Sequence, residues 1–162
     1  MVAPVLLFAI GNESRGDDAL GPLLLRELNA YLVESGLSGQ VELLEEYQLQ
    51  IEHAIDMQER ELVLFIDAGM DTEAPFTFST AKANDVPMLY SHALAPEALL
   101  KVYTQLYQEK PPAVFILCIR GERFELGEGL SPQAEEHLEL ALAFSKKLLM
   151  NAEVDTWNGL LN

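Results

Sequence analysis

Two adjacent carboxylates, Asp17 and Asp18, lie in the glycine-bearing segment 11–22, after the strand-like residues 5–10 and before an amphipathic segment. Ligands of open α/β sheets bind at such positions, at the carboxyl ends of the strands. Three interpretations are open: a turn in which one aspartate caps the helix, a phosphate-binding loop, and a metal or acid/base site. The phosphate loop is disfavoured because G-x-G-x-x-G and G-K-[ST] spacings are absent and because paired carboxylates repel phosphate.

Two further side chains are candidates to complete a site with Asp18. Asp67 directly follows the apolar run 62–66, although an aspartate there is also common as a simple turn residue. His92 lies just before a predicted helix, where a lone histidine is usually structural or exposed. Asp18, Asp67 and His92 together offer two oxygen donors and one nitrogen donor. That set suits a borderline divalent ion such as nickel or zinc, with open positions for water or a substrate group.

Other catalytic chemistries have little support in the sequence. G-x-S-x-G and H-E-x-x-H motifs are both absent, which argues against a serine nucleophile elbow and a helix-borne zinc peptidase site. The single cysteine, Cys118, lies in an apolar strand-like run and is expected to be a buried structural thiol. We expect His53 at a surface or boundary position and His137 in solvent.

Alternating apolar runs and amphipathic segments predict an α/β domain with helices on both faces of a sheet. Within it, Ile51, Ile55 and Leu106 are expected to face inward. Gly36 suits a left-handed helix end, and Ser131-Pro132 a helix start. The expected strands are residues 2–10, 40–45, 61–67, 76–79 and 113–119, and the expected helices are 18–35, 50–57, one opening at 96 and one running from 131 to about 150.

These elements predict a three-layer fold with a mostly parallel five-stranded sheet. The fourth strand is expected as an antiparallel edge strand that follows the third in hairpin fashion, because a parallel crossover needs a dozen or more residues. Right-handed crossovers place the ends of the first and third strands, and hence Asp18 and Asp67, on one edge. Residues 1–150 are expected to form a single domain, and residues 151–162 a frayed tail.

Composition narrows the classes of partner. The chain has 162 residues, a formal net charge of −16 and 49% hydrophobic residues. Such acidity argues against binding nucleic acid or an anionic membrane surface. No signal peptide and no apolar stretch of about 20 residues is visible, so we expect a cytoplasmic protein, and we favour a monomer.

Four short motifs, in order and spacing, resemble those of the nickel–iron hydrogenase maturation proteases, also called hydrogenase maturation endopeptidases. Residues 11–22 resemble the family's G-N … D-[DE]-x-x-G motif, and residues 66–68 its second acidic motif. Residues 91–92 resemble its histidine motif, and residues 129–132 its G-L-[ST]-P helix start. The resemblance extends over nearly the whole chain.

The resemblance implies an endopeptidase that removes a short C-terminal peptide from the nickel-loaded large-subunit precursor of a hydrogenase. It implies that Asp18, Asp67 and His92 are the catalytic and metal-contacting residues and that Asp17 shapes their loop. The nickel would be supplied by the precursor, so that the enzyme holds no metal at rest. Which carboxylate acts as general base is left open.

One segment departs from the family pattern. Residues 45–49 read Glu-Glu-Tyr-Gln-Leu where many members carry a Gly-Gly pair, and this variant is similar to the branch that serves bidirectional, NAD(P)-linked hydrogenases. Two alternative functions are also compatible with the sequence. One is a nickel-checkpoint chaperone that docks to the precursor without cutting it, and the other is a flavodoxin-like small-ligand protein that uses residues 11–18.

Overall fold

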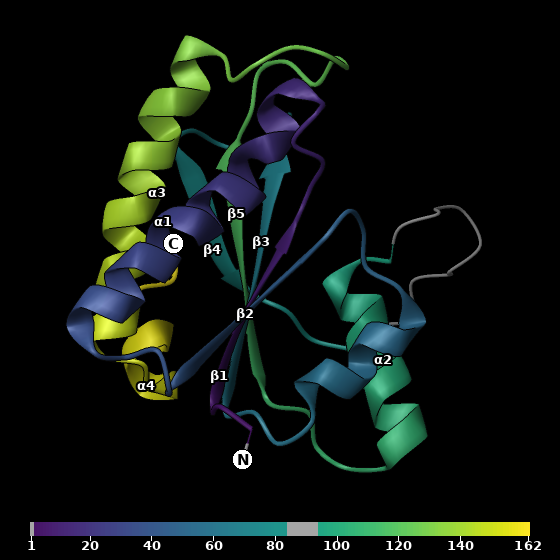
Figure 1. Cartoon of the computed structure of the whole chain (residues 1–162). Helices are drawn as coiled ribbons and strands as arrows, with labels where there is room; N and C mark the ends of the chain where they lie inside the picture. The colour runs from purple at the N-terminus through teal and green to yellow at the C-terminus, as the bar shows by residue number, and fades with distance from the viewer. Residues whose placement is uncertain (1, 84–93) are drawn as a thin grey trace.

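The computed structural model describes residues 2–83 and 94–162 and contains a five-stranded sheet in the order β2-β1-β3-β5-β4 (Figure 1). The first four of these strands are parallel, and β4 runs antiparallel to β5. The predicted α/β fold class, with its mostly parallel sheet and one antiparallel strand, is confirmed. The strands are β1 (Val5–Ile10), β2 (Val41–Glu46), β3 (Leu62–Gly69), β4 (Phe76–Thr80) and β5 (Ala113–Arg120).

The antiparallel strand β4 lies at the edge of the sheet, as predicted, but beside a different neighbour from the one expected. It pairs with β5, with Phe76 opposite Ile119, and not with β3. Both sides of β3 are already occupied, by β1 and by β5. The connection from β3 to β4 therefore carries the chain past β5, and the prediction of a simple hairpin is wrong.

Helices cover both faces of the sheet (Figure 1). One face carries α1 (Leu20–Ser35) and α3 (Pro132–Met150), and the other carries α2 (Pro96–Tyr107) and the 3₁₀ helix η2 (Ile51–Met57). Alternate residues of the central strands feed the two cores, which explains why these strands are apolar without interruption. Within the described residues, no helix has the length and apolar character needed to cross a bilayer.

Three apolar residues predicted to face inward are exposed. Ile51 and Ile55 are 47% and 62% exposed, while Ala54 and Met57 of the same helix are buried. The helix is 3₁₀, with three residues per turn, so residues 54 and 57 share the inward face instead. Leu106 is 60% exposed, because the buried positions of α2 end one turn earlier.

The C-terminal residues are folded onto the sheet, so the expectation of a frayed tail is wrong. They form the short helix α4 (Val154–Asn158), whose Trp157 is fully buried and donates from Nε1 to the carbonyl of Leu148 at 2.9 Å. Beyond it, the side chain of Asn162 accepts the backbone N–H of Phe78 in β4 at 2.7 Å. A large aromatic side chain outweighs the tendency of chain ends to fray, because it buries much apolar surface.

The replacement Trp157→Phe is expected to lower the free energy of unfolding by about 1–2 kcal/mol. It removes the indole hydrogen bond and leaves the carbonyl of Leu148 without that partner, in a buried setting where such a loss is costly. Urea denaturation followed by far-UV circular dichroism measures the change. Leu161→Ala, at a position 37% exposed, is the control and should change stability by less than about 0.5 kcal/mol. Equal, small effects for both variants would contradict the docked tail.

Candidate functional site

A tight turn after β1 brings Asp18 back over the carboxyl edge of the sheet. Gly11 has a φ of +154°, and a Cβ there would lie 2.0 Å from the carbonyl oxygen of Asp18, so no other residue fits. The chain then forms the 3₁₀ turn η1 (Gly16–Ala19), which carries Asp18. The backbone N–H of Asn12 donates to Asp18 Oδ2 at 2.8 Å and orients the carboxylate.

The start of α1 packs directly on the ends of β1 and β3. A Cβ on Gly21 would lie 2.9 Å from the carbonyl oxygen of Ile10 and 3.0 Å from that of Ile66. This close approach sets the segment that carries Asp18 against the strand end that carries Asp67. The prediction that the ends of the first and third strands share one edge is therefore confirmed.

Asp18 lies near enough to Asp67 for its negative charge to act on the Asp67 carboxyl. Burial raises the pKa of Asp67 to about 7, the Ala68 backbone N–H opposes that shift, and the negative charge of Asp18 adds to it. Burial also raises the pKa of Asp18, against the hydrogen bond from Asn12 and the charge of Arg15. A pair of partly buried like charges is stabilised by a cation placed between them.

The third predicted site residue, His92, lies outside the described residues, so its position relative to Asp18 and Asp67 stays a prediction. In the ranges 2–83 and 94–162, no group of three His, Cys, Asp or Glu side chains is arranged to hold a metal ion. The described part of the site is thus a pair of carboxylates, and a complete three-donor set requires a ligand from elsewhere.

Asp17 is fully buried and serves as an anchor between two loops. Its Oδ2 accepts the backbone N–H groups of Glu122 at 2.6 Å and Arg123 at 3.1 Å. Ser131 donates its backbone N–H to Oδ1 and its hydroxyl to Oδ2, both at 2.7 Å. Burial alone would raise the pKa of Asp17, but these four hydrogen bonds outweigh it and lower the pKa below its usual value. Asp17 thereby has the loop-shaping role expected for it.

The hydrogen bonds between Asp17 and Ser131 were not predicted from the sequence. Ser131 caps α3 as predicted, accepting the N–H of Ala134 at 3.1 Å, yet the same hydroxyl donates to Asp17. The two residues are 114 positions apart, and nothing local in either segment signals their pairing.

Cys118 is only half-buried and lies beside the site, so the expectation of a buried thiol is wrong. It is opposite Asp67 in the pairing of β3 with β5, and its Sγ is 2.9 Å from Thr72 Oγ1. Burial raises the pKa of the thiol, the bond to Thr72 opposes this, and the charge of Asp67 adds to it. The register of two parallel strands, which the sequence leaves undefined, brings Cys118 to this position.

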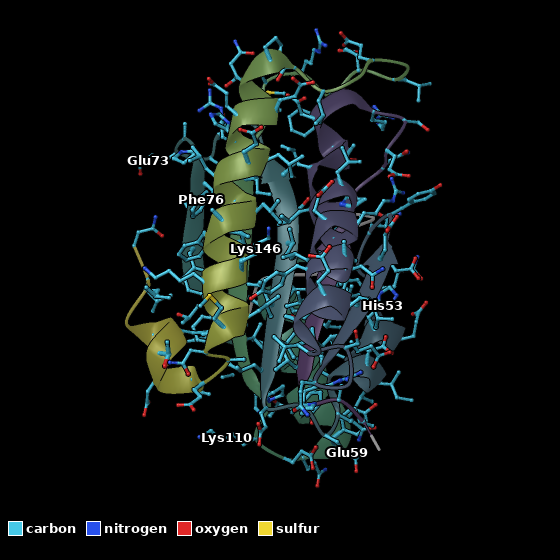
Figure 2. All side chains as sticks on the ribbon, turned by 60° about the vertical axis from the view of Figure 1, so that its left-hand side comes forward. His53, Glu59, Glu73, Phe76, Lys110 and Lys146 are labelled. Carbon is cyan, nitrogen blue, oxygen red and sulfur yellow. The ribbon has the colours of Figure 1, made fainter. Side chains whose placement is uncertain are left out.

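The two described histidines have structural contacts. His53 lies at the margin of the molecule (Figure 2), accepts the backbone N–H of Gln50 at 2.8 Å and sets its ring edge-on to Phe8, a boundary position as predicted. His137 was expected in solvent, but it is partly buried and its Nδ1 lies 2.9 Å from the carbonyl oxygen of Arg120. That contact exists because α3 packs against the end of β5, so the solvated prediction is wrong.

The replacement Asp67→Asn is expected to stabilise the protein at alkaline pH and not at acidic pH. The pKa rises from 3.8 to about 7 on folding, so the folded state favours the protonated carboxyl. That advantage is complete below the unfolded pKa of 3.8 and is lost as pH rises through about 7. At about pH 8 the variant should be more stable than the parent by about 4 kcal/mol, and near pH 4 the two should be alike.

Urea denaturation at the two pH values measures this difference. The exposed Asp71→Asn is the control, since it removes the same charge two residues beyond β3. A gain for Asp67→Asn that does not change with pH would contradict a raised pKa as its cause.

Solved structures share this fold. The [NiFe] hydrogenase maturation protease HycI from Thermococcus kodakarensis KOD1 superimposes with a TM-score of 0.66 at 21% identity, over 92% of this chain and 94% of its own. The hydrogenase maturating endopeptidase HybD from E. coli gives a TM-score of 0.67 at 22% identity, over 91% and 93%. An endopeptidase from Escherichia coli gives 0.66 at 23% identity, over 93% and 94%. No protein-family model and no curated protein matches the sequence.

Proposed function

We propose that this chain is an endopeptidase that removes a short C-terminal peptide from the nickel-loaded large-subunit precursor of a nickel–iron hydrogenase. The observation that carries the proposal is the pair Asp18 and Asp67, two partly buried carboxylates at the carboxyl edge of a sheet. The fold of that sheet is shared with solved hydrogenase maturation proteases at 21% and 22% identity. The motifs at residues 11–22, 66–68, 91–92 and 129–132 give independent support.

The donor chemistry suits recognition of a nickel ion that belongs to the precursor. A bound cation would relieve the electrostatic repulsion between the two carboxylates, and His92 would add the nitrogen donor that a borderline metal prefers. A site with few protein ligands leaves positions open for the groups that already hold the metal in the substrate. Nickel would therefore belong to the substrate and would not be a resident cofactor of this chain.

In the proposed reaction, the chain's own residues position the substrate and handle protons. Docking against Asp18, Asp67 and His92 would hold the scissile peptide beside the carboxylates, so that proximity supplies much of the rate. Docked nickel would supply Lewis-acid polarisation of a carbonyl or a water. Asp18 or Asp67 would accept the proton of the attacking water and return it to the departing amine. Asn12 keeps Asp18 oriented through its 2.8 Å bond.

The sequence also suggests which class of hydrogenase supplies the precursor. The Glu-Glu-Tyr-Gln-Leu segment at residues 45–49 supports a bidirectional, NAD(P)-linked hydrogenase as the source of the precursor. Its Tyr47 is 74% exposed at the end of β2, where a partner can reach it. We further propose that the enzyme acts in the cytoplasm as a monomer, without nucleic acid or membrane.

Intact mass spectrometry of the precursor tests the proposal. A nickel-loaded precursor should lose a short C-terminal peptide on incubation with this protein, and the nickel-free precursor should keep its full mass. A stable complex with the cognate nickel-loaded precursor but no loss of mass would contradict the protease and favour a nickel-checkpoint chaperone. Neither binding nor cleavage across several precursors would favour a small-ligand protein.

A further inference from the structure

A cavity of about 560 Å³ lies at the amino edge of the sheet, opposite the edge that carries Asp18 and Asp67. The ends of three strands line this cavity. They contribute Glu61, which precedes β3, Thr80, which ends β4, and Pro112, which precedes β5. Helix α4 adds Val154 and Asn158. Cavities that hold small ligands measure about 300–1,000 Å³, so this one has room for a small molecule.

The inner wall of this amino-edge cavity is apolar and firmly packed. Leu100 of α2 and Val114 and Phe115 of β5 contribute to it, and these residues are 2%, 4% and 1% exposed. Side chains held this tightly form a preformed surface that does not need to collapse around a ligand. Such a surface favours a hydrocarbon body over a fully polar solute.

Two lysines, Lys82 and Lys110, lie on the mouth of the cavity, and both are exposed. The chain has only ten lysines and arginines against a net charge of −16, so two at one cavity reverse the local charge. Neither forms an ion pair with another residue in the part of the chain that the structure describes, and Glu61 is the one acidic side chain on the lining there. Figure 2 shows Lys110 at the end of the molecule below the sheet.

We infer that the amino-edge cavity binds a monocarboxylate with an apolar body, which inserts against Leu100, Val114 and Phe115 and places its carboxylate between Lys82 and Lys110. Flexible lysine stems can bring both ammonium groups to one anion. The whole length of the sheet separates this cavity from Asp18 and Asp67, so the inference does not depend on the proposed function.

Titration with octanoate, followed through backbone amide resonances in ¹⁵N-labelled full-length protein, tests the inference. Saturable shifts are expected at residues on the cavity wall, such as Ala81, Val114 and Asn158, and not at Asp18. 1-Octanol, which has the same body without the charge, should bind about fivefold to tenfold more weakly, as the loss of two exposed ion pairs predicts. N-acetyl-leucine presents the carboxylate on a peptide unit, and comparison with octanoate distinguishes a peptide terminus from a fatty acid as the source.

The double variant Lys82→Gln/Lys110→Gln should weaken octanoate binding by the same factor and leave 1-octanol binding unchanged. Lys146→Gln/Lys147→Gln on α3, which makes the same change in net charge away from the cavity, is the matched control and should bind like the parent. Three results would overturn the inference: no saturable shift with either carboxylate, equal binding of octanoate and octanol, or equal weakening by both double variants.

Discussion

Asp18→Asn is expected to slow cleavage of the nickel-loaded precursor by at least about 100-fold. Replacing groups that merely support metal ligands typically costs about 10–100-fold in metal affinity or activity, and the loss of a ligand should cost no less. The amide has nearly the shape of the carboxylate and can still accept the Asn12 N–H. The fold should therefore persist while the negative charge is lost. Time-resolved intact mass of the precursor gives the rate.

Asp71→Asn is the matched control for this variant. Asp71 is an exposed carboxylate in the turn after β3, so the change has the same chemistry and the same effect on net charge. Cleavage by Asp71→Asn should stay within about twofold of the parent, since surface substitutions have small effects. A normal rate for Asp18→Asn would remove Asp18 from the mechanism. A uniform loss in both variants would point to net charge, and not to a site.

The arrangement of Asp18 and Asp67 was predictable from the sequence because it depends on topology. Asp67 directly follows an uninterrupted apolar run, and Asp18 lies in the loop after another. The carboxyl ends of parallel strands lie together at one edge. Two helix boundaries follow from local backbone chemistry. Gly36 ends α1 in the left-handed conformation, with a φ of 74°, and Ser131 caps the start of α3. Patterns of this kind are encoded within a few residues.

The features that were missed depend on contacts between distant segments. The bonds from Glu122, Arg123 and Ser131 to Asp17 join segments more than a hundred residues apart. The placement of Cys118 beside Asp67 requires the register of β3 and β5, and the docking of Trp157 requires the aromatic cluster around Phe78. Hydrophobic periodicity identifies which residues are buried and not which partners they find, so these features appear only in the folded chain.

Asp17→Ala is expected to lower the free energy of unfolding by about 4 kcal/mol. The change leaves three backbone N–H groups and the Ser131 hydroxyl without their acceptor. Each unsatisfied buried donor costs about 1–3 kcal/mol, and local relaxation toward solvent recovers part of the total. Since domains of this size are stable by about 5–15 kcal/mol, the variant should fold with a much reduced urea midpoint.

The pH dependence of stability distinguishes the loss of a buried, hydrogen-bonded anion at Asp17 from a simple loss of packing. The pKa of Asp17 is lowered on folding from 3.8, so its contribution to stability is present above pH 3.8 and is lost as pH falls through the lower folded value. The difference between Asp17→Ala and the parent should therefore shrink in strong acid. Ser131→Ala removes one of the four bonds and should cost less, about 1–2 kcal/mol. A difference that is the same at every pH would mean that the Asp17 side chain stabilises the loops through its volume, and not through a buried anion held by its donors.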